Sequence, residues 1–281
     1  EVDPANPDHY IEGDQSLPFS IRDEEILIKD KEVDDGFRRE TLRVRVTKRG
    51  PVISDHGMSL SSERDARIAN ESADPDEDSG MGRVLSLRWS VPEMLLDETG
   101  VRRLLLATSV AEAIDAIGTI PTPLNYIVVD YQGNIARKAS GYVPLRVRGD
   151  GSQPIGLMVE DNWNGRIPAE EMPLDLNPER DWVGSANHRV TESDYPYAYT
   201  TYASPSWRYR RLMELFEAKS VTANDHWQFI QDNKNLMAER LTPIIISAIN
   251  SDPELAEFTD ILSRWNFMDT REQAAPAIFQ T

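Results

Sequence analysis

The segment VGSANHRV, residues 183–190, gathers four side chains that can take part in a reaction: Ser185, Asn187, His188 and Arg189. An Asn side chain can donate an amide hydrogen bond to negative charge that develops in a transition state. Asn is equally a common residue of turns and helix caps, where its side chain bonds the local backbone. Taken alone, this segment therefore favours an ordinary polar turn.

Other patterns associated with catalysis or metal binding are missing from the sequence. The four histidines are far apart and form no HExxH pattern, and neither GxGxxG, a P-loop nor GxSxG is present. The chain has no cysteine, which excludes disulfides, thiolate zinc sites and a thiol nucleophile within these residues. We therefore expect no histidine-based metal site at His9, His56, His188 or His226.

The acidic segment ESADPDEDSG, residues 71–80, has some features of a calcium-binding loop. An EF-hand loop that began at Asp74 would need Gly at its sixth position and Glu at its twelfth. Those positions hold Ser79 and Leu85. We predict instead that this segment is a solvated, mobile loop.

The composition is that of a folded protein with an acidic surface. The chain has 281 residues, is 40% hydrophobic and carries 48 acidic against 30 basic residues, a formal net charge of −18. This length is enough for one large domain or two ordinary ones. A negative surface repels phosphate, so we expect no nucleic-acid partner. No apolar run has the length needed to span a bilayer, so we expect no membrane partner.

The first half of the sequence has the alternation typical of β-strands. Leu42, Val44 and Val46 alternate with arginines in TLRVRV, which predicts a strand with one buried face. Residues 126–139 contain two strand-like runs around a turn at Gln132-Gly133. Two further runs lie at residues 144–151 and 154–163.

Helical patterns appear once among these strands and then dominate the end of the chain. Ser109 and Glu112 predict a capping box for a helix over residues 110–117 that ends at Gly118. After Pro205, three further helices are indicated. Their signals are the apolar positions 212, 215 and 216, the pair Thr222 and Asp225, and the start at Asp252-Pro253. Strands followed by helices predict an α+β fold with a largely antiparallel sheet.

Several short segments follow one another along the chain in a defined order. They are DHYIEGD, KRGPVISD, LSLRW, PLNYIVVDYQGNIARKASGYVPLR, GDGSQPIGLMVEDNWNGRIPAEEMPLDLNP, GSANHRV and WRYRRLMELF. The most specific patterns among them are D-x-x-GNI, W-x-G-x-IP-x-x-E-x-P and NP…AN. This order resembles the large β-chain of the penicillin acylase family of N-terminal nucleophile (Ntn) hydrolases over nearly the whole sequence.

The resemblance implies a fold and a division of the chain. The fold would be an αββα sandwich of antiparallel sheets with a helical C-terminal part. Residues 1–204 would form the β-rich part of the sandwich and residues 205–281 the helical part of the same domain. Because both ends resemble internal segments of the family's β-chain, we expect the fold within these residues to be incomplete.

The resemblance also implies a reaction. In the family, the first residue of the β-chain, normally Ser, is exposed when a zymogen precursor cleaves itself, and its hydroxyl attacks a linear amide with its own α-amino group as base. Glu1 is not such a nucleophile, so we expect the nucleophile to lie outside this chain and residues 1–281 alone to be inactive. The substrate would be a penicillin or cephalosporin-type amide, as in antibiotic biosynthesis, or an N-acyl homoserine lactone.

Three residues take roles from the resemblance. Asn187 occupies the position of the family's oxyanion donor, and Arg208 that of an arginine near the active centre. Asp8 stands where many members hold a structural calcium ion, although a further ligand position falls at Tyr199, which cannot replace a carboxylate. His188 occupies a position where relatives more often carry a second Asn. We expect no organic cofactor.

The resemblance implies partners and a location as well. The partners would be the remaining segments of the precursor, namely the α-chain and the rest of the β-chain, and a small acyl amide. The location implied by the family is periplasmic or secreted. The alternative from composition is a non-catalytic, acidic, β-rich binding or structural module.

Overall fold

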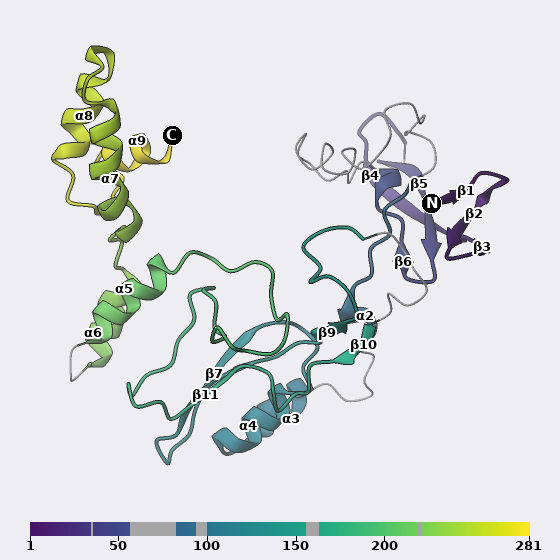
Figure 1. Ribbon diagram of the computed structural model, residues 1–281, viewed down its shortest axis with the longest axis horizontal. Coiled ribbons are helices and arrows are strands. Elements are labelled where there is room, and N and C mark those ends of the chain that lie inside the picture. The colour runs from purple at the N-terminus through teal and green to yellow at the C-terminus, as the bar shows by residue number, and fades with distance from the viewer. Residues whose placement is uncertain (35, 57–82, 94–99, 156–162, 218–220) are drawn as a thin grey trace. The chain divides into compact units, whose positions relative to one another are not determined.

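The computed structural model describes residues 1–34, 36–56, 83–93, 100–155, 163–217 and 221–281 (Figure 1). Contacts divide the chain into two compact units. Unit 1 comprises residues 1–99, 120–123 and 141–169, and unit 2 comprises residues 100–119, 124–140 and 170–281. The acidic segment 71–80 lies outside the described residues, as does most of the strand-like run 154–163. No helix among the described residues is long and apolar enough to cross a membrane.

Unit 1 is built from antiparallel strands. They form a sheet of order β1-β2-β3, a sheet of order β4-β5-β6 and the pair β9-β10. Two short helical turns accompany them. The bounds are β1 Val2–Asp3, β2 Asn6–Glu12, β3 Gln15–Pro18, β4 Ser20–Lys29, β5 Phe37–Thr47, β6 Gly50–Pro51, β9 Pro144–Arg146, β10 Trp163–Arg166, η1 Ser54–His56 and α2 Ser90–Glu93.

The predicted strand at residues 41–46 is confirmed as part of β5. Its partner β4 follows it over ten residue pairs, from Ser20 opposite Val46 to Lys29 opposite Phe37. Val44 is 7% exposed, whereas Arg43 is exposed, as the alternation predicts. A small core of Tyr10, Phe19 and Val52 joins the first two sheets.

Unit 2 combines a three-stranded antiparallel sheet of order β11-β8-β7 with most of the helices. The helix α4 packs against β7 and β8 (Figure 1). The bounds are α3 Gly100–Leu106, α4 Val110–Ile117, β7 Asn125–Val129, β8 Ile135–Ala139, β11 Leu174–Leu176, α5 Trp207–Phe216, α6 Ala223–Ile230, α7 Leu236–Ile249, η2 Pro253–Leu255, α8 Ala256–Ser263 and α9 Ala275–Gln280.

The predicted helix at residues 110–117 is confirmed as α4, with a difference at each end. The Ser109 hydroxyl accepts the Glu112 N–H at 3.2 Å, but the Glu112 carboxylate accepts the Thr108 N–H at 2.7 Å. Gly118 does end the helix, yet with φ −57, so its freedom to adopt positive φ is not used. Positive φ is used at Gly133, where φ is 88 in the predicted turn between β7 and β8.

The predicted helices after Pro205 are confirmed as α5, α6 and the pair η2–α8. Thr222 and Asp225 form the full capping box of α6. The Asp252 side chain accepts the Glu254 N–H at 2.9 Å, although the first turn is 3-10 rather than α. The sequence patterns did not predict α7, which contains Pro243 and is capped by Asn235.

The coarse prediction of an α+β chain with antiparallel pairing is confirmed, because every strand pair in the described part of the chain is antiparallel. The described strands end by Leu176, and α5 to α9 all begin at Trp207 or later. The predicted boundary between residues 204 and 205 lies inside unit 2, and this division of the chain stays a prediction. A buried cluster of Ala238, Leu262, Trp265 and Ala275 holds α7, α8 and α9 together.

Candidate active site

Asn187 lies in an irregular loop of unit 2 and has an unusual backbone. Its φ is +60, a left-handed conformation that Asn tolerates better than most residues with a side chain. The neighbouring Ala186 is 7% exposed, whereas the Asn187 side chain is exposed. The Ser204 N–H donates to the Asn187 carbonyl oxygen at 2.7 Å. The loop is therefore anchored by its backbone and presents the Asn187 amide at the surface of the unit.

Arg208, on the first turn of α5, binds this loop directly. Its Nη2 donates to the Asn187 Oδ1 and to the Ala186 carbonyl oxygen, each at 2.8 Å. A guanidinium has donors and no acceptor, so the amide atom that faces Arg208 must be the oxygen. The Asn187 Nδ2 therefore faces away from Arg208, and within the described residues no acceptor takes its hydrogens. Arg208 fixes the orientation of the amide and leaves its donor side unused.

Aromatic rings attach the same loop to α5. The His188 ring stacks on Tyr209 with centroids 3.6 Å apart and an interplanar angle of 17°. Trp182 stacks on Phe216 with centroids 5.0 Å apart, and it also contacts Tyr209. These contacts hold both ends of residues 182–188 against one face of the helix that carries Arg208.

His188 is held in its neutral form. Burial lowers the pKa of His188, and the positive charges of Arg137 and Arg180 lower it further, while Asp175 opposes them. The neutral ring can accept a hydrogen bond, and its Nδ1 lies 3.4 Å from the Ala186 N–H. His188 therefore supports the backbone next to Asn187 as an uncharged ring.

An ion-pair network connects the loop to the sheet of unit 2. Arg137, on β8, is 2% exposed and donates to Asp175 at 3.0 Å and to Asn125 at 3.0 Å. Arg180 donates to the same Asp175 carboxylate at 2.8 Å and to the Trp182 carbonyl oxygen at 3.0 Å. Burial raises the pKa of Asp175, but the two arginines outweigh it, so the net pKa is lowered and the carboxylate stays charged.

Two of the three most specific sequence patterns meet in one hydrogen-bond network. The Asp130 carboxylate accepts the backbone N–H and the side-chain amide of Asn134 in D-x-x-GNI, and also the Val110 N–H at the start of α4. The Asn177 side chain of the NP segment donates to Asn134 Oδ1 at 2.9 Å and accepts the Ile135 N–H at 2.8 Å. These residue types therefore join a turn, a helix and the end of β11.

Glu171, in W-x-G-x-IP-x-x-E-x-P, braces the segment that follows the Asn187 loop. Its carboxylate accepts the Tyr197 hydroxyl and its carbonyl oxygen accepts the Tyr195 hydroxyl at 2.8 Å. Burial raises the pKa of Tyr195 to about 12, so this phenol remains a donor at neutral pH. The motif glutamate has a structural part in unit 2.

Asp8 lies on β2 in unit 1 as an exposed side chain. Among the described residues, no group of three or more His, Cys, Asp or Glu could hold a metal ion. The pKa of Arg45 is raised, chiefly by its hydrogen bond to Asp55 and in smaller part by Asp8. Asp8 therefore has no cluster of acidic ligands around it among the described residues, and its calcium role stays a prediction.

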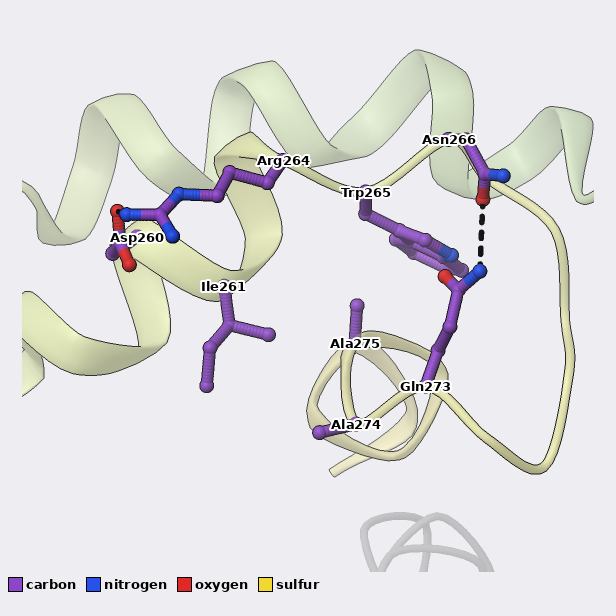
Figure 2. Close-up of a pocket in the computed structure, with 8 residues that line it drawn as sticks. All are labelled: Asp260, Ile261, Arg264, Trp265, Asn266, Gln273, Ala274 and Ala275. Carbon is purple, nitrogen blue, oxygen red and sulfur yellow. Dashed lines mark hydrogen bonds and ion pairs between the residues drawn. The ribbon is translucent and has the colours of Figure 1, made fainter.

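A small cavity in the helical part of unit 2 offers less chemistry. It has a volume of about 370 Å³ between α8 and α9 (Figure 2). Figure 2 shows Arg264 extended toward Asp260 on one side and Gln273 facing Asn266 on the other. The Gln273 Nε2 donates to the Asn266 Oδ1 at 3.3 Å. Because these polar groups satisfy one another, we do not regard this cavity as the candidate site.

Comparison with known proteins decides the family. The model of the family described as penicillin amidase matches residues 1–281, the whole chain. The chain belongs to the penicillin amidase family. Its fold is similar to that of a thermostable penicillin G acylase from Alcaligenes faecalis, with a TM-score of 0.67 and 18% identity over 100% of this chain and 48% of that one.

Curated members of the penicillin amidase family match parts of the chain. The penicillin acylase 2 proenzyme of Pseudomonas sp. (strain SE83) is 31% identical over 179 residues, which is 61% of this chain and 23% of that protein. The acyl-homoserine lactone acylase QuiP of Pseudomonas aeruginosa is 29% identical over 122 residues, covering 43% of this chain and 14% of that protein. The matched segments thus span less than a quarter of these relatives' length.

Within this penicillin amidase chain, the predicted site residues fall into two groups. Asn187 and Arg208, 21 residues apart in sequence, are in direct contact, whereas Asp8 lies in the other unit. The oxyanion and calcium roles stay predictions. Sequence reasoning missed Arg137, Asp175 and Arg180. The adjacent cations in the strand-like run IARKA were a signal, because neighbouring side chains of a strand point to opposite faces and a cation on the buried face needs an anionic partner.

Proposed function

We propose that the protein containing this chain hydrolyses a linear acyl amide and that Asn187 donates a hydrogen bond to the oxyanion of the tetrahedral intermediate. The observation that carries the proposal is the bond from Arg208 to Asn187 Oδ1. It turns the amide N–H groups outward and holds them there before any substrate binds. Such preorganisation is what makes a hydrogen-bond donor effective in a transition state.

The remaining parts of the reaction would come from outside residues 1–281. A Ser at the start of the processed β-chain would attack the amide carbonyl carbon, and its α-amino group would take the hydroxyl proton. The α-ammonium group would give that proton to the leaving nitrogen as the C–N bond of the tetrahedral intermediate breaks, and water would then hydrolyse the acyl-enzyme ester. Arg208 would act as a positioning residue, because it touches Asn187 rather than the reacting atoms.

Family membership supports the wider parts of this proposal. We infer an Ntn αββα sandwich completed by other segments of a self-processing precursor. The substrate would be a penicillin-type or cephalosporin-type amide or an N-acyl homoserine lactone, since relatives of both names match this chain. A calcium ion at Asp8 stays a prediction, and no step of the reaction involves it.

The test is a direct assay of the whole protein expressed from its gene. We expect the purified protein to release free amine from N-acyl homoserine lactones or from penicillins, and sequencing of the processed β-chain to find an N-terminal Ser. Residues 1–281 alone should release none. An unprocessed, inactive protein that folds normally would contradict the proposal and support a non-catalytic module.

A further inference from the structure

A second cavity, in unit 1, concentrates positive charge in an otherwise acidic protein. Its volume is about 880 Å³, within the usual range of small-molecule sites. Glu1 is the one acidic residue among the described residues that line it. Five of the chain's 30 basic residues line it: Arg49, Arg83, Arg88, Arg146 and Arg148.

Backbone pairing brings these arginines together from distant parts of the sequence. Ser86 pairs with Val52, and the Leu87 N–H donates to the Pro51 carbonyl oxygen at 2.8 Å. The two segments approach so closely that a Cβ atom on Gly50 would lie 1.9 Å from the Leu87 carbonyl oxygen, so this approach requires glycine. In the strand pair β9-β10, Trp163 lies opposite Arg146.

Arg49, Arg83 and Arg88 each form an ion pair with a described carboxylate. Glu12, 1% exposed, accepts from both Lys48 at 2.9 Å and Arg49 at 2.8 Å, so one carboxylate serves two cations. Arg88 pairs with Glu93 through two bonds of 2.7 and 2.9 Å. Its Nη1 is nevertheless buried without a hydrogen-bond partner among the described residues.

Arg146 is the cation with the weakest compensation. No hydrogen bond or ion pair joins its guanidinium to another residue in the part of the chain that the structure describes. Burial lowers the pKa of Arg146, and the nearby charge of Asp150 opposes this. The guanidinium lies across Gly151, where an added Cβ atom would come within 2.9 Å of its Nη2. A partly desolvated guanidinium of this kind gains most from a planar anion that accepts two parallel hydrogen bonds.

Part of the remaining lining is apolar, beside the polar Ser86 and Gln153. Arg88 stacks over the Trp163 ring at 3.9 Å, and Arg146 lies 5.9 Å from the same ring. Ile11, Val84 and Ile155 also line the cavity. The cavity therefore offers guanidinium groups together with an apolar wall of aromatic and aliphatic side chains.

We propose that this cavity binds an organic carboxylate with an apolar body, with its carboxylate on Arg146 and its body against Trp163. Inorganic phosphate would satisfy the arginines equally well, but it would leave the apolar wall without a contact. The proposal does not depend on amide hydrolysis, because binding to unit 1 is measured without turnover.

The experiment is calorimetric titration of the whole protein with three probes: benzoate, its neutral counterpart benzamide, and inorganic phosphate. We expect saturable binding of benzoate and at least tenfold weaker binding of the other two. Arg146→Gln should weaken benzoate binding about tenfold, and Arg146→Lys should restore part of the loss, since it keeps the charge without the fork.

Two further variants keep the test decisive. Arg83 lines the cavity but its side chain is 60% exposed, so Arg83→Gln should fold normally and still weaken benzoate binding by a few-fold. Arg38→Gln removes the same charge from an exposed ion pair on β5, outside the cavity lining, and should leave binding unchanged. Equal binding of benzoate and benzamide, phosphate binding as tight as benzoate, or an equal loss in Arg38→Gln and both cavity variants would each overturn the proposal.

Discussion

Replacing Asn187 with Gly separates a role in catalysis from a role in the turn. Gly removes the amide but adopts a φ of +60 without strain, so the loop keeps its backbone. If the Asn187 Nδ2 donates to the oxyanion, its loss raises the barrier by about 3–4 kcal/mol, so kcat should fall by roughly 10²–10³. KM should change less, because the bond strengthens only as negative charge develops.

The stability of the same variant should hardly change. The bond between Arg208 and Asn187 lies at the exposed end of the side chain, where water can replace it at a cost below about 1 kcal/mol. Relief of the left-handed strain offsets part of that cost. Asn187→Ala keeps the strain, so it should be about 1 kcal/mol less stable than the Gly variant yet equally slow.

The assay is steady-state kinetics of the processed enzyme, with urea denaturation of each variant. Both substitutions should share one loss of kcat while they differ in the free energy of unfolding. A Gly variant that turns over at the wild-type rate would refute the oxyanion role. So would a loss of activity that follows stability, with Ala impaired and Gly normal.

Three further outcomes follow from the geometry. Arg208→Ala should lower kcat, but it should lower kcat little further in the Asn187→Gly variant, because Arg208 acts through the Asn187 amide. Additive losses of kcat in this double-mutant cycle would contradict the positioning role. Because the pKa of His188 is lowered in the folded state, the unfolded chain binds more protons, and the free energy of unfolding should fall as pH drops below about 6.5. His188→Gln should reduce this fall, measured by urea denaturation from pH 8 to 5. Gly100→Ala would place a Cβ atom 1.8 Å from a carbonyl oxygen of α4 and should lower the free energy of unfolding by about 2 kcal/mol or more. The control Val101→Ala, at a side chain 48% exposed, should change it by no more than about 0.5 kcal/mol in thermal melts of both variants.

Local sequence was sufficient where a few neighbouring residues decide the structure. Gly133 permits the turn between β7 and β8, and Thr222 with Asp225 closes the first turn of α6. The same local reasoning failed for α7, because it contains Pro243 and a proline usually ends a helix. The order of short motifs, rather than any one of them, identified the family and directed attention to Asn187 and Arg208.

Only the tertiary structure decided how those residues face one another. The direction of the Asn187 amide depends on a guanidinium 21 positions away, and the loop that carries it depends on a contact between Arg137 and Asp175, 38 positions apart. The arginine cavity likewise requires strand pairing between residues 51–53 and 85–87 and between β9 and β10. Residue type determines which hydrogen bonds a side chain can make, but the partner and the direction are set by packing between segments that are remote in the chain.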